Sequence, residues 1–318
     1  MQSSRLIPFT VAGTICFAAA FLLGAVAWYL FGTKHRSTGG NTNVVVQTSK
    51  PNAVEPSPSN TENINETAAA SPTPTAAPEI KKAPAGEIKI DGGEVMLGGE
   101  IFIDGKPAKM PLRRVAVADF FIGETEVTNR QYFEFVSAAE YRAPGGWKDG
   151  KFLPGTDDEP VVVVTWADAN AYCKWLSKEI GAEVRLPGEA EWERAARGDS
   201  ADNKYPWGDE WNDEAALDSE TKEKARPVKS FPAGRSPGGA YEMVGNVWEW
   251  TSDLAVDEFG KPVLYEKSKQ RIIKGGSAKE SLLEDDERQK YMTIDAHLNR
   301  PEDKPSELLG FRYVVVRK

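Results

Sequence analysis

The chain has 318 residues, of which 40% are hydrophobic and 27% charged, and its formal net charge is −9. This composition allows one large folded domain or two small ones, and the acidic balance argues against a nucleic-acid-binding surface. The chain has only two Cys and two His, far apart in the sequence, and we expect no Cys/His zinc site. Cys16 lies in an apolar run and Cys173 in a predicted helix, so we expect no intramolecular disulfide.

The first segment is an uncharged apolar run at residues 6–31, which is long enough to cross a bilayer. Basic residues flank it on both sides, and Trp28 and Tyr29 suit a membrane interface. Residues 25–27 resemble a signal-peptidase site, but apolar residues continue beyond them. We therefore predict that residues 1–34 are an uncleaved anchor of a single-pass membrane protein. Its soluble domain is expected outside the cytoplasm, periplasmic or extracellular, and the architecture is typical of bacteria.

Residues 35–85 form a second segment, rich in Ser, Thr, Asn, Pro and Ala. Such a composition does not bury enough apolar surface to fold, so we predict a disordered linker. As a coil it would reach roughly 40 Å. The linker would hold the remaining domain, residues 86–318, near the membrane.

The folded domain is predicted to begin with two strands, at residues 91–99 and 113–122, which are rich in β-prone residues. A helix is expected to begin after Thr128, which forms a capping box with Gln131. Apolar residues then recur at helical spacing.

Two further helices have clear boundaries. Thr165 is the predicted N-cap of the first, and Gly181 ends it. Cys173 lies on its apolar face, where a thiol is usually inert. The second helix covers residues 189–197 and carries acidic residues in its first turn, where they favour the helix dipole. The polar residues 212–226 that follow are predicted to be a surface loop.

Residues 234–238 match the G-x-S-x-G pattern of serine hydrolases. The oxyanion hole of these enzymes needs the backbone N–H of the residue after the serine, and Pro237 has none. We therefore reject a serine hydrolase site.

Residues 238–250 contain two tryptophans, Trp248 and Trp250, on either side of Glu249. The indoles favour burial, so the carboxylate needs a cation, a metal or several hydrogen-bond donors. Glu242 precedes the same Gly-Asn turn, and two carboxylates with turn carbonyls suit a hard cation such as calcium. Spacing alone favours the simpler interpretation, in which the tryptophans are core and Glu249 accepts backbone hydrogen bonds.

The last quarter of the chain begins with a predicted strand and tight turn at residues 271–277. Residues 278–309 are charged and show weak periodicity. Residues 310–316 are predicted to be a closing strand that pairs with an early strand of the domain.

Several motifs in this order resemble the formylglycine-generating enzyme (sulfatase-modifying factor) family, and the resemblance covers nearly all of residues 88–318. It implies an α+β fold, a single C-type-lectin-like domain with little regular secondary structure, often stabilised by calcium. The motifs are Gly92-Gly93, Glu126-Val127-Thr128-Asn129, Arg185-Leu186-Pro187, Glu189-Ala190-Glu191-Trp192-Glu193, Pro206-Trp207-Gly208, Gly245-Asn246-Val247-Trp248-Glu249-Trp250, Gly275-Gly276-Ser277 and Gly310-Phe311-Arg312.

The resemblance also implies a structural calcium site. Its ligands would be the side chains of Glu242 and Glu249 and the backbone carbonyls of Gly245 and Val247. Family members often have Asp or Asn at the first position, so Glu242 is a conservative departure.

The resemblance does not extend to the catalytic cysteines of the family. Formylglycine-generating members carry two cysteines shortly after the Gly-Gly-Ser turn, and these bind copper. By ungapped count from Ser277 the two positions fall on Glu280 and Asp285, and no cysteine follows Cys173. Copper(I) prefers sulfur ligands, so no copper is expected. The related sulfoxide synthases use a histidine-rich iron site, which His297 alone cannot supply.

The leading hypothesis is a membrane-tethered, non-catalytic binding or scaffold module, a pseudoenzyme whose partner is an unknown protein or glycan. Residues 279–309 would form its recognition face, because loops fixed on a rigid scaffold are common binding surfaces. Nine acidic residues lie within 279–307. They favour either a basic partner or a simple solvated face.

Two alternatives are oxidoreductases. In one, Glu280, Asp285 and His297 gather around iron or manganese. In the other, the chain is a formylglycine-generating oxidase with a different oxygen-activating chemistry. Either would act on a protein or on a small thiol substrate.

Overall fold

The computed structural model describes residues 86–200, 202–216, 224–257 and 261–317. The predicted anchor and linker lie outside this part of the chain and remain predictions. Within the described residues, no helix has both the length and the apolar character needed to cross a membrane.

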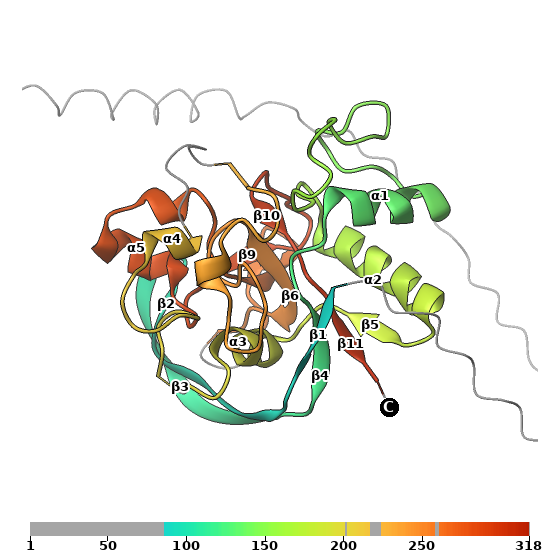
Figure 1. Cartoon of the computed structure of the whole chain (residues 1–318). Coiled ribbons are helices and arrows are strands. Elements are labelled where there is room, and N and C mark those ends of the chain that lie inside the picture. The colour runs from blue at the N-terminus through green and yellow to red at the C-terminus, as the bar shows by residue number, and fades with distance from the viewer. Residues whose placement is uncertain (1–85, 201, 217–223, 258–260, 318) are drawn as a thin grey trace, which may run out of the picture. The chain divides into compact units, whose positions relative to one another are not determined.

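A four-stranded antiparallel sheet joins the start of the domain to its end (Figure 1). Its order is β1 (Glu87–Ile90), β4 (Phe120–Gly123), β11 (Val314–Val316) and β5 (Glu183–Arg185). In β11, Val314 lies opposite Ile122 of β4. The prediction that a late strand pairs with an early one is therefore confirmed.

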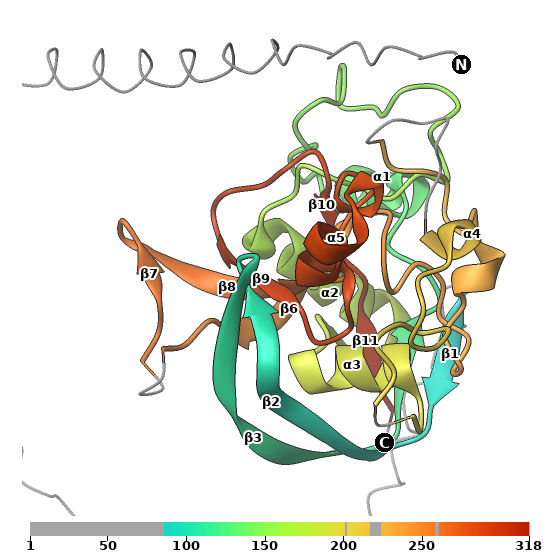
Figure 2. The ribbon, with the colours of Figure 1, turned by 90° about the vertical axis from the view of Figure 1, so that its left-hand side faces the viewer.

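The larger sheet has the order β10-β6-β8-β9-β2-β3, with β7 paired to β8. Figure 2 shows the long β2–β3 hairpin curving around α3 (Glu189–Arg197), while the β7–β8 hairpin projects away. Because α3 lies within this curve, the hairpin covers one side of the helix. The strands are β2 (Gly93–Ile103), β3 (Lys106–Val117), β6 (Trp248–Leu254), β7 (Leu264–Tyr265), β8 (Ser268–Lys274), β9 (His297–Pro301) and β10 (Leu309–Gly310).

The strand predicted at residues 113–122 is in fact parts of two strands, β3 and β4, which belong to different sheets. The break falls at a corner held by Asp119. Its Oδ1 accepts a hydrogen bond from the backbone N of Gly92 at 2.8 Å, and its Oδ2 lies 2.8 Å from the Lys89 ammonium. Periodicity does not show such a corner, because β-prone residues continue on both sides of it.

The three predicted helices are confirmed, as α1 (Asn129–Ala138), α2 (Trp166–Ile180) and α3. Thr128 forms the expected capping box with Gln131, and Gly181 ends α2 in the left-handed conformation at φ 70°. The predicted loop at 212–226 begins with a one-turn helix. The shorter helices are α4 (Asp213–Ala216), η1 (Pro232–Gly234), η2 (Glu280–Leu282) and α5 (Asp285–Met292).

Aromatic rings pack against one another in the larger of the two core clusters. Tyr132 of α1 stacks on Tyr172 of α2 with ring centroids 5.8 Å apart, and both rings contact Phe311. Trp248 and Trp250 are buried in the same cluster, as predicted. Cys173 is also buried there, and burial raises the pKa of its thiol, so the prediction of an unreactive core cysteine agrees with its surroundings.

Candidate functional site

Glu249 is fully buried, and its partner is an arginine. The two oxygens of Glu249 each lie 2.7 Å from a nitrogen of Arg312, and Oε2 also accepts a hydrogen bond from Trp192 Nε1 at 3.0 Å. Such a bidentate pair satisfies the carboxylate in both charge and geometry. The expectation that Glu249 accepts backbone hydrogen bonds is therefore wrong. Arg312 stands in the Gly310-Phe311-Arg312 motif, which lies far from Glu249 in sequence.

Two further carboxylates surround the same guanidinium. Glu126 accepts a hydrogen bond from Asn246 Nδ2 at 3.0 Å, and Glu242 accepts one from the backbone N of Phe231 at 3.3 Å. The Oε2 atom of each is buried without a hydrogen-bond partner among the described residues. Burial, together with the neighbouring Glu242, raises the pKa of Glu126; burial raises that of Glu242 to about 7. We call Glu126, Glu242, Glu249 and Arg312 the acidic cluster.

The predicted calcium ligands fit this arrangement only in part. Oε2 of Glu242 is a buried oxygen that a cation would satisfy, whereas both oxygens of Glu249 already face Arg312. Across the described ranges, no group of three or more His, Cys, Asp or Glu side chains is arranged to hold a metal ion. The calcium site at Glu242, Gly245, Val247 and Glu249 therefore stays a prediction.

The two positions that the count from Ser277 assigns to the copper-binding cysteines lie in different surroundings. Glu280 Oε2 accepts a hydrogen bond from Trp248 Nε1 at 3.2 Å and another from the Ser277 hydroxyl. Asp285 begins α5, pairs with Arg288 at 2.9 Å, and has a side chain that is 79% exposed. Glu280 is thus fixed in place, while Asp285 faces solvent.

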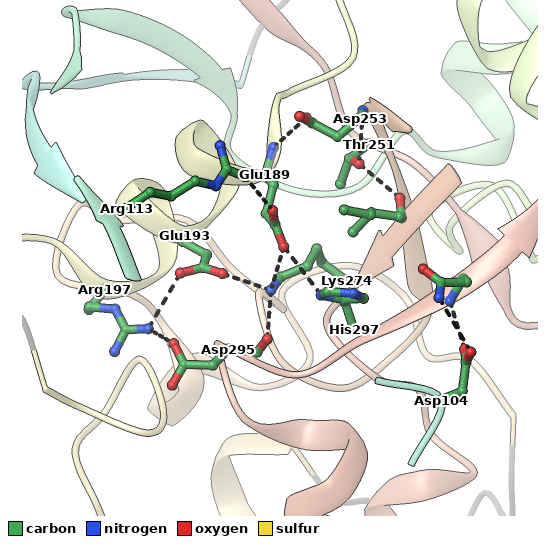
Figure 3. A network of polar contacts seen from close by, with 12 residues as sticks. Asp104, Arg113, Glu189, Glu193, Arg197, Thr251, Asp253, Lys274, Asp295 and His297 are labelled. Atoms are coloured by element: carbon green, nitrogen blue, oxygen red, sulfur yellow. Dashed lines mark hydrogen bonds and ion pairs between the residues drawn. The ribbon is translucent and has the colours of Figure 1, made fainter. Parts of the chain in front are cut away.

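His297 takes part in a separate buried network, shown in Figure 3. Its Nδ1 lies 3.3 Å from Glu189 Oε1, on the side of β9 that faces α3. The hypothesis that Glu280, Asp285 and His297 gather around iron or manganese is therefore wrong, because each has a different protein partner.

Lys274 is the centre of this network and is fully buried. Its ammonium donates to Glu193 Oε1 at 2.8 Å and to the backbone O of Asp295 at 3.2 Å. Arg197 lies 3.6 Å from Glu193 and also pairs with the Asp295 side chain. We call Glu189, Glu193, Arg197, Lys274, Asp295 and His297 the balanced cluster, since its cations and carboxylates alternate.

The pKa values of the two glutamates of the balanced cluster are shifted in opposite directions. Burial raises the pKa of Glu193 to about 7, and the charge of Lys274 opposes this only in part. Burial would also raise the pKa of Glu189, but the hydrogen bond with His297 and the charge of Lys274 lower it to about 2. No pattern in the sequence indicates this network, because its members lie on α3, on β8, on β9 and in the loop before β9, and they meet only in the fold.

A cavity of about 250 Å³ opens beside Glu280 and is lined by Trp248, Ser277 and Asp104 of the β2–β3 turn. A larger cleft of about 840 Å³ adjoins it, because Lys279, Ser306 and Leu308 line both. We call the two together the groove. Its wall at residues 306–308 belongs to the predicted recognition face, residues 279–309.

The opposite wall of the larger cleft comes from residues 145–163, which sequence reasoning missed. Trp147 packs on Phe152 with ring centroids 5.4 Å apart, and Phe133 contacts both rings. Val163, which also lines the cleft, has φ +59°, an uncommon conformation for a β-branched residue. Its backbone N bonds to the O of Ser306 at 3.0 Å and so ties the two walls together. Strain of this kind clusters at functional sites.

The groove combines an aromatic wall with charges of both signs. Glu159 and Glu307 line the larger cleft, as do Lys224 and Lys279. Apolar surface with a few polar groups is typical of ligand sites. The arrangement can bind a neutral or mixed-charge ligand, and it presents no thiol, since Cys173 is buried in the core.

The model of a protein family described as "Sulfatase-modifying factor enzyme 1-like domain" matches residues 73–317. The chain belongs to this family. A formylglycine-generating enzyme of Streptomyces coelicolor is 30% identical over 77% of this chain and 93% of that protein. An inactive Cα-formylglycine-generating enzyme 2 of Bos taurus is 27% identical over 71% of this chain and 86% of that protein.

The solved structure of PvdO from Pseudomonas aeruginosa has the same fold, with a TM-score of 0.58 and 25% identity, covering 73% of this chain and 94% of that one. The predicted α+β, C-type-lectin-like fold of the sulfatase-modifying factor family is therefore confirmed. One of these relatives is named as a formylglycine-generating enzyme and another as an inactive one, so membership of the family does not by itself decide whether this chain is an enzyme.

Proposed function

We propose that this family member is a non-catalytic binding module whose groove recognises a protein segment or a glycan. The observation that carries the proposal is Glu280. It stands at the first copper-ligand position, and its carboxylate is held by Trp248 and Ser277. A carboxylate is a poor ligand for copper(I), and the second position, Asp285, is exposed and paired with Arg288.

The groove supports a binding role because its walls are fixed. The Val163–Ser306 backbone bond and the Trp147–Phe152–Phe133 packing hold the two sides without a ligand. A preformed site loses little entropy on binding. We further propose that the N-terminal run anchors the chain in a membrane with the domain outside the cytoplasm. The net charge of −9 favours partners other than nucleic acid.

Calcium is proposed as a structural ion of the acidic cluster. The free Oε2 of Glu242 supports this assignment, and a hard cation prefers such oxygen ligands. Calcium at about a hundred times its Kd would stabilise the fold by roughly 2.7 kcal/mol. We expect calcium to raise the Tm of the wild-type chain and to leave that of Glu242→Gln unchanged; an equal rise in both would remove Glu242 from the site.

The alternative is a formylglycine-generating type of oxidase, favoured by the identity to the Streptomyces coelicolor enzyme over 93% of that protein. The test is elemental analysis of the full chain, purified without a metal-binding tag and dialysed without chelator, followed by oxidation assays on Cys-containing peptides. Calcium alone and no peptide oxidation would support the binding module. Stoichiometric copper, iron or manganese with turnover would overturn it.

The binding face itself is tested on peptide and glycan arrays. We expect labelled full chain to bind a subset of the probes. Trp147→Phe and Lys279→Glu should weaken this binding, whereas Lys267→Glu, on the projecting β7–β8 hairpin, should not. Binding that all three variants retain would place the site elsewhere.

A further inference from the structure

Arg300 of β9 carries a charge that no carboxylate of the described residues pairs. Twelve other arginines each lie within 4.0 Å of a carboxylate oxygen. The partners of Arg300 are carbonyls: its Nε donates to the backbone O of Lys304 at 2.8 Å, and its Nη2 donates to that of Pro305 at 2.9 Å. Burial lowers the pKa of this half-buried guanidinium, as expected for a cation without a nearby anion.

A second arginine lies opposite Arg300 in the sheet. Arg271 of β8 is its register partner, and like charges directly opposite each other destabilise a sheet. The Arg271 guanidinium is already paired, since its Nε lies 3.0 Å from Glu302 Oε2, and it also stacks on the Trp166 ring at 3.8 Å. One carboxylate thus serves two guanidiniums, and an anion beside Arg300 would balance the second.

The side chain of Arg300 lies on the face of β9 that borders the smaller cavity of the groove. Residues two apart on a strand share a face, and Leu298, two residues before Arg300, lines this cavity as Arg300 does. His297 has the opposite orientation, because its ring contacts Glu189 of α3. The strand therefore presents the guanidinium next to the cavity.

The four charged residues of this cavity differ in how far the chain already satisfies them. Glu280 accepts two hydrogen bonds at Oε2. Asp104 accepts hydrogen bonds from the backbone N and the Nδ2 of Asn299, at 2.8 and 3.4 Å. Arg300 has only neutral carbonyls, and Lys279 is exposed. Donors of the chain thus hold both carboxylates, whereas the cations remain to be balanced, so the cavity favours an anion.

The rest of the cavity favours an apolar group beside that anion. At about 30 Å³ for each water molecule, its volume of about 250 Å³ has room for about eight non-hydrogen atoms. The side chain and carboxylate of a C-terminal leucine are of this size. The apolar residues of the lining are Trp248, Ile273, Leu298, Leu308 and Leu309.

We propose that the cavity binds the C-terminal residue of a partner peptide, with the carboxylate on Arg300 and an apolar side chain against Leu298 and Trp248. Arginine and carboxylate form strong, charge-assisted hydrogen bonds. The inference rests on the proposed binding function and names its ligand. The preceding residues of the peptide would follow the larger cleft, which adjoins the cavity, along the aromatic wall at Trp147.

The test compares the peptide acetyl-Ala-Ala-Leu, which ends in a free carboxylate, with the same peptide as its C-terminal amide. Binding to the isotope-labelled full chain is measured from the NMR shift of the Trp248 indole N–H, which lies at the cavity. We expect the acid to bind about tenfold more tightly than the amide, because hydrogen bonds to charged groups contribute about that factor. Arg300→Gln should remove this preference, whereas Lys267→Gln, on the projecting β7–β8 hairpin, should keep it.

Two further probes separate a peptide C-terminus from other carboxylates. Acetyl-Ala-Ala-Glu-amide carries its carboxylate on a side chain, and glucuronate carries one on a sugar; both should bind more weakly than the peptide acid. The proposal is overturned by equal affinity of acid and amide, by no shift with either, by tighter binding of a further probe, or by a preference that Arg300→Gln retains. The comparison of acid and amide uses the wild type, so it decides the matter even where Arg300→Gln does not fold. Those outcomes leave the binding module standing, since its failure is read separately, from metal content and peptide oxidation.

Discussion

The two buried ionic clusters of this domain differ in their charge balance. The acidic cluster places Glu126, Glu242 and Glu249 around a single cation, Arg312, and leaves two carboxylate oxygens without partners. In the balanced cluster, Lys274 and Arg197 divide the charge of Glu193 and its neighbours. Trp192 contacts both clusters. Its Nε1–H donates a hydrogen bond to Glu249 of the acidic cluster, and the Lys274 ammonium of the balanced cluster lies 5.6 Å from the centroid of its ring.

The difference shows which cluster holds carboxylate charge in excess of its cations. Buried charge is tolerated only when it is paired, so excess carboxylate must take up a proton or a cation. The acidic cluster can therefore respond to pH. The balanced cluster fixes α3 against β8 and β9, and its Glu193, whose pKa burial also raises to about 7, titrates in the same pH range as Glu242.

The largest expected effect is that of Arg312→Met. It removes the only cation of the acidic cluster and should cost about 5 kcal/mol, the upper end for breaking a buried ion pair. Urea unfolding of the full chain measures this, and the double variant R312M/E249Q should recover part of the loss. A cost below about 1 kcal/mol would show that the carboxylates do not depend on the arginine.

Lys274→Met should cost less, about 3 kcal/mol, because Arg197 still faces Glu193. The same unfolding measurement applies, with K274M/E193Q as the matched rescue. A cost equal to that of Arg312→Met would mean that charge balance does not distinguish the two clusters.

The third prediction concerns pH. The pKa of Glu242 rises from 4.5 to about 7 on folding, so the folded state holds a proton that the unfolded state has released. The resulting stability is complete below pH 4.5 and is lost as the pH rises through about 7. We expect Glu242→Gln to remove about 2 kcal/mol of the stability difference between pH 5 and pH 8.

Glu189→Gln is the control for this experiment. The pKa of Glu189 is lowered to about 2, so its contribution is lost only as the pH falls through that value. The stability difference between pH 5 and pH 8 should therefore be the same as in the wild type. A change as large as that of Glu242→Gln would refute the assignment of the pH response to the acidic cluster.

The smallest expected effect is that of Glu280→Ala. Like Glu249, Glu280 accepts a hydrogen bond from an indole, but it lies half-buried beside a cavity. Water can replace the lost acceptor, so the cost should be about 1 kcal/mol. Thermal unfolding checks it, and a loss above about 3 kcal/mol would make Glu280 a structural anchor comparable to Glu249.

The local elements and the family could be predicted from the sequence. Caps such as Thr128 and Thr165 and stops such as Gly181 depend on neighbours within one turn, so α1, α2 and α3 were predictable. The missing cysteines at 280 and 285 were equally visible. Burial of Trp248 and Trp250 followed from composition alone.

Which charged groups meet became visible only in the folded structure. Arg312 and Glu249 are 63 residues apart in the sequence, and Lys274 and Glu193 are 81 apart. The periodicity of apolar residues does not predict contacts between residues so far apart. The split of residues 113–122 into two strands and the aromatic wall at Trp147 likewise depend on which sheet or loop lies opposite. Charge pairs and the walls of a groove join residues that are far apart in the sequence. Helix and strand propensity and helix capping depend only on residues a few positions apart.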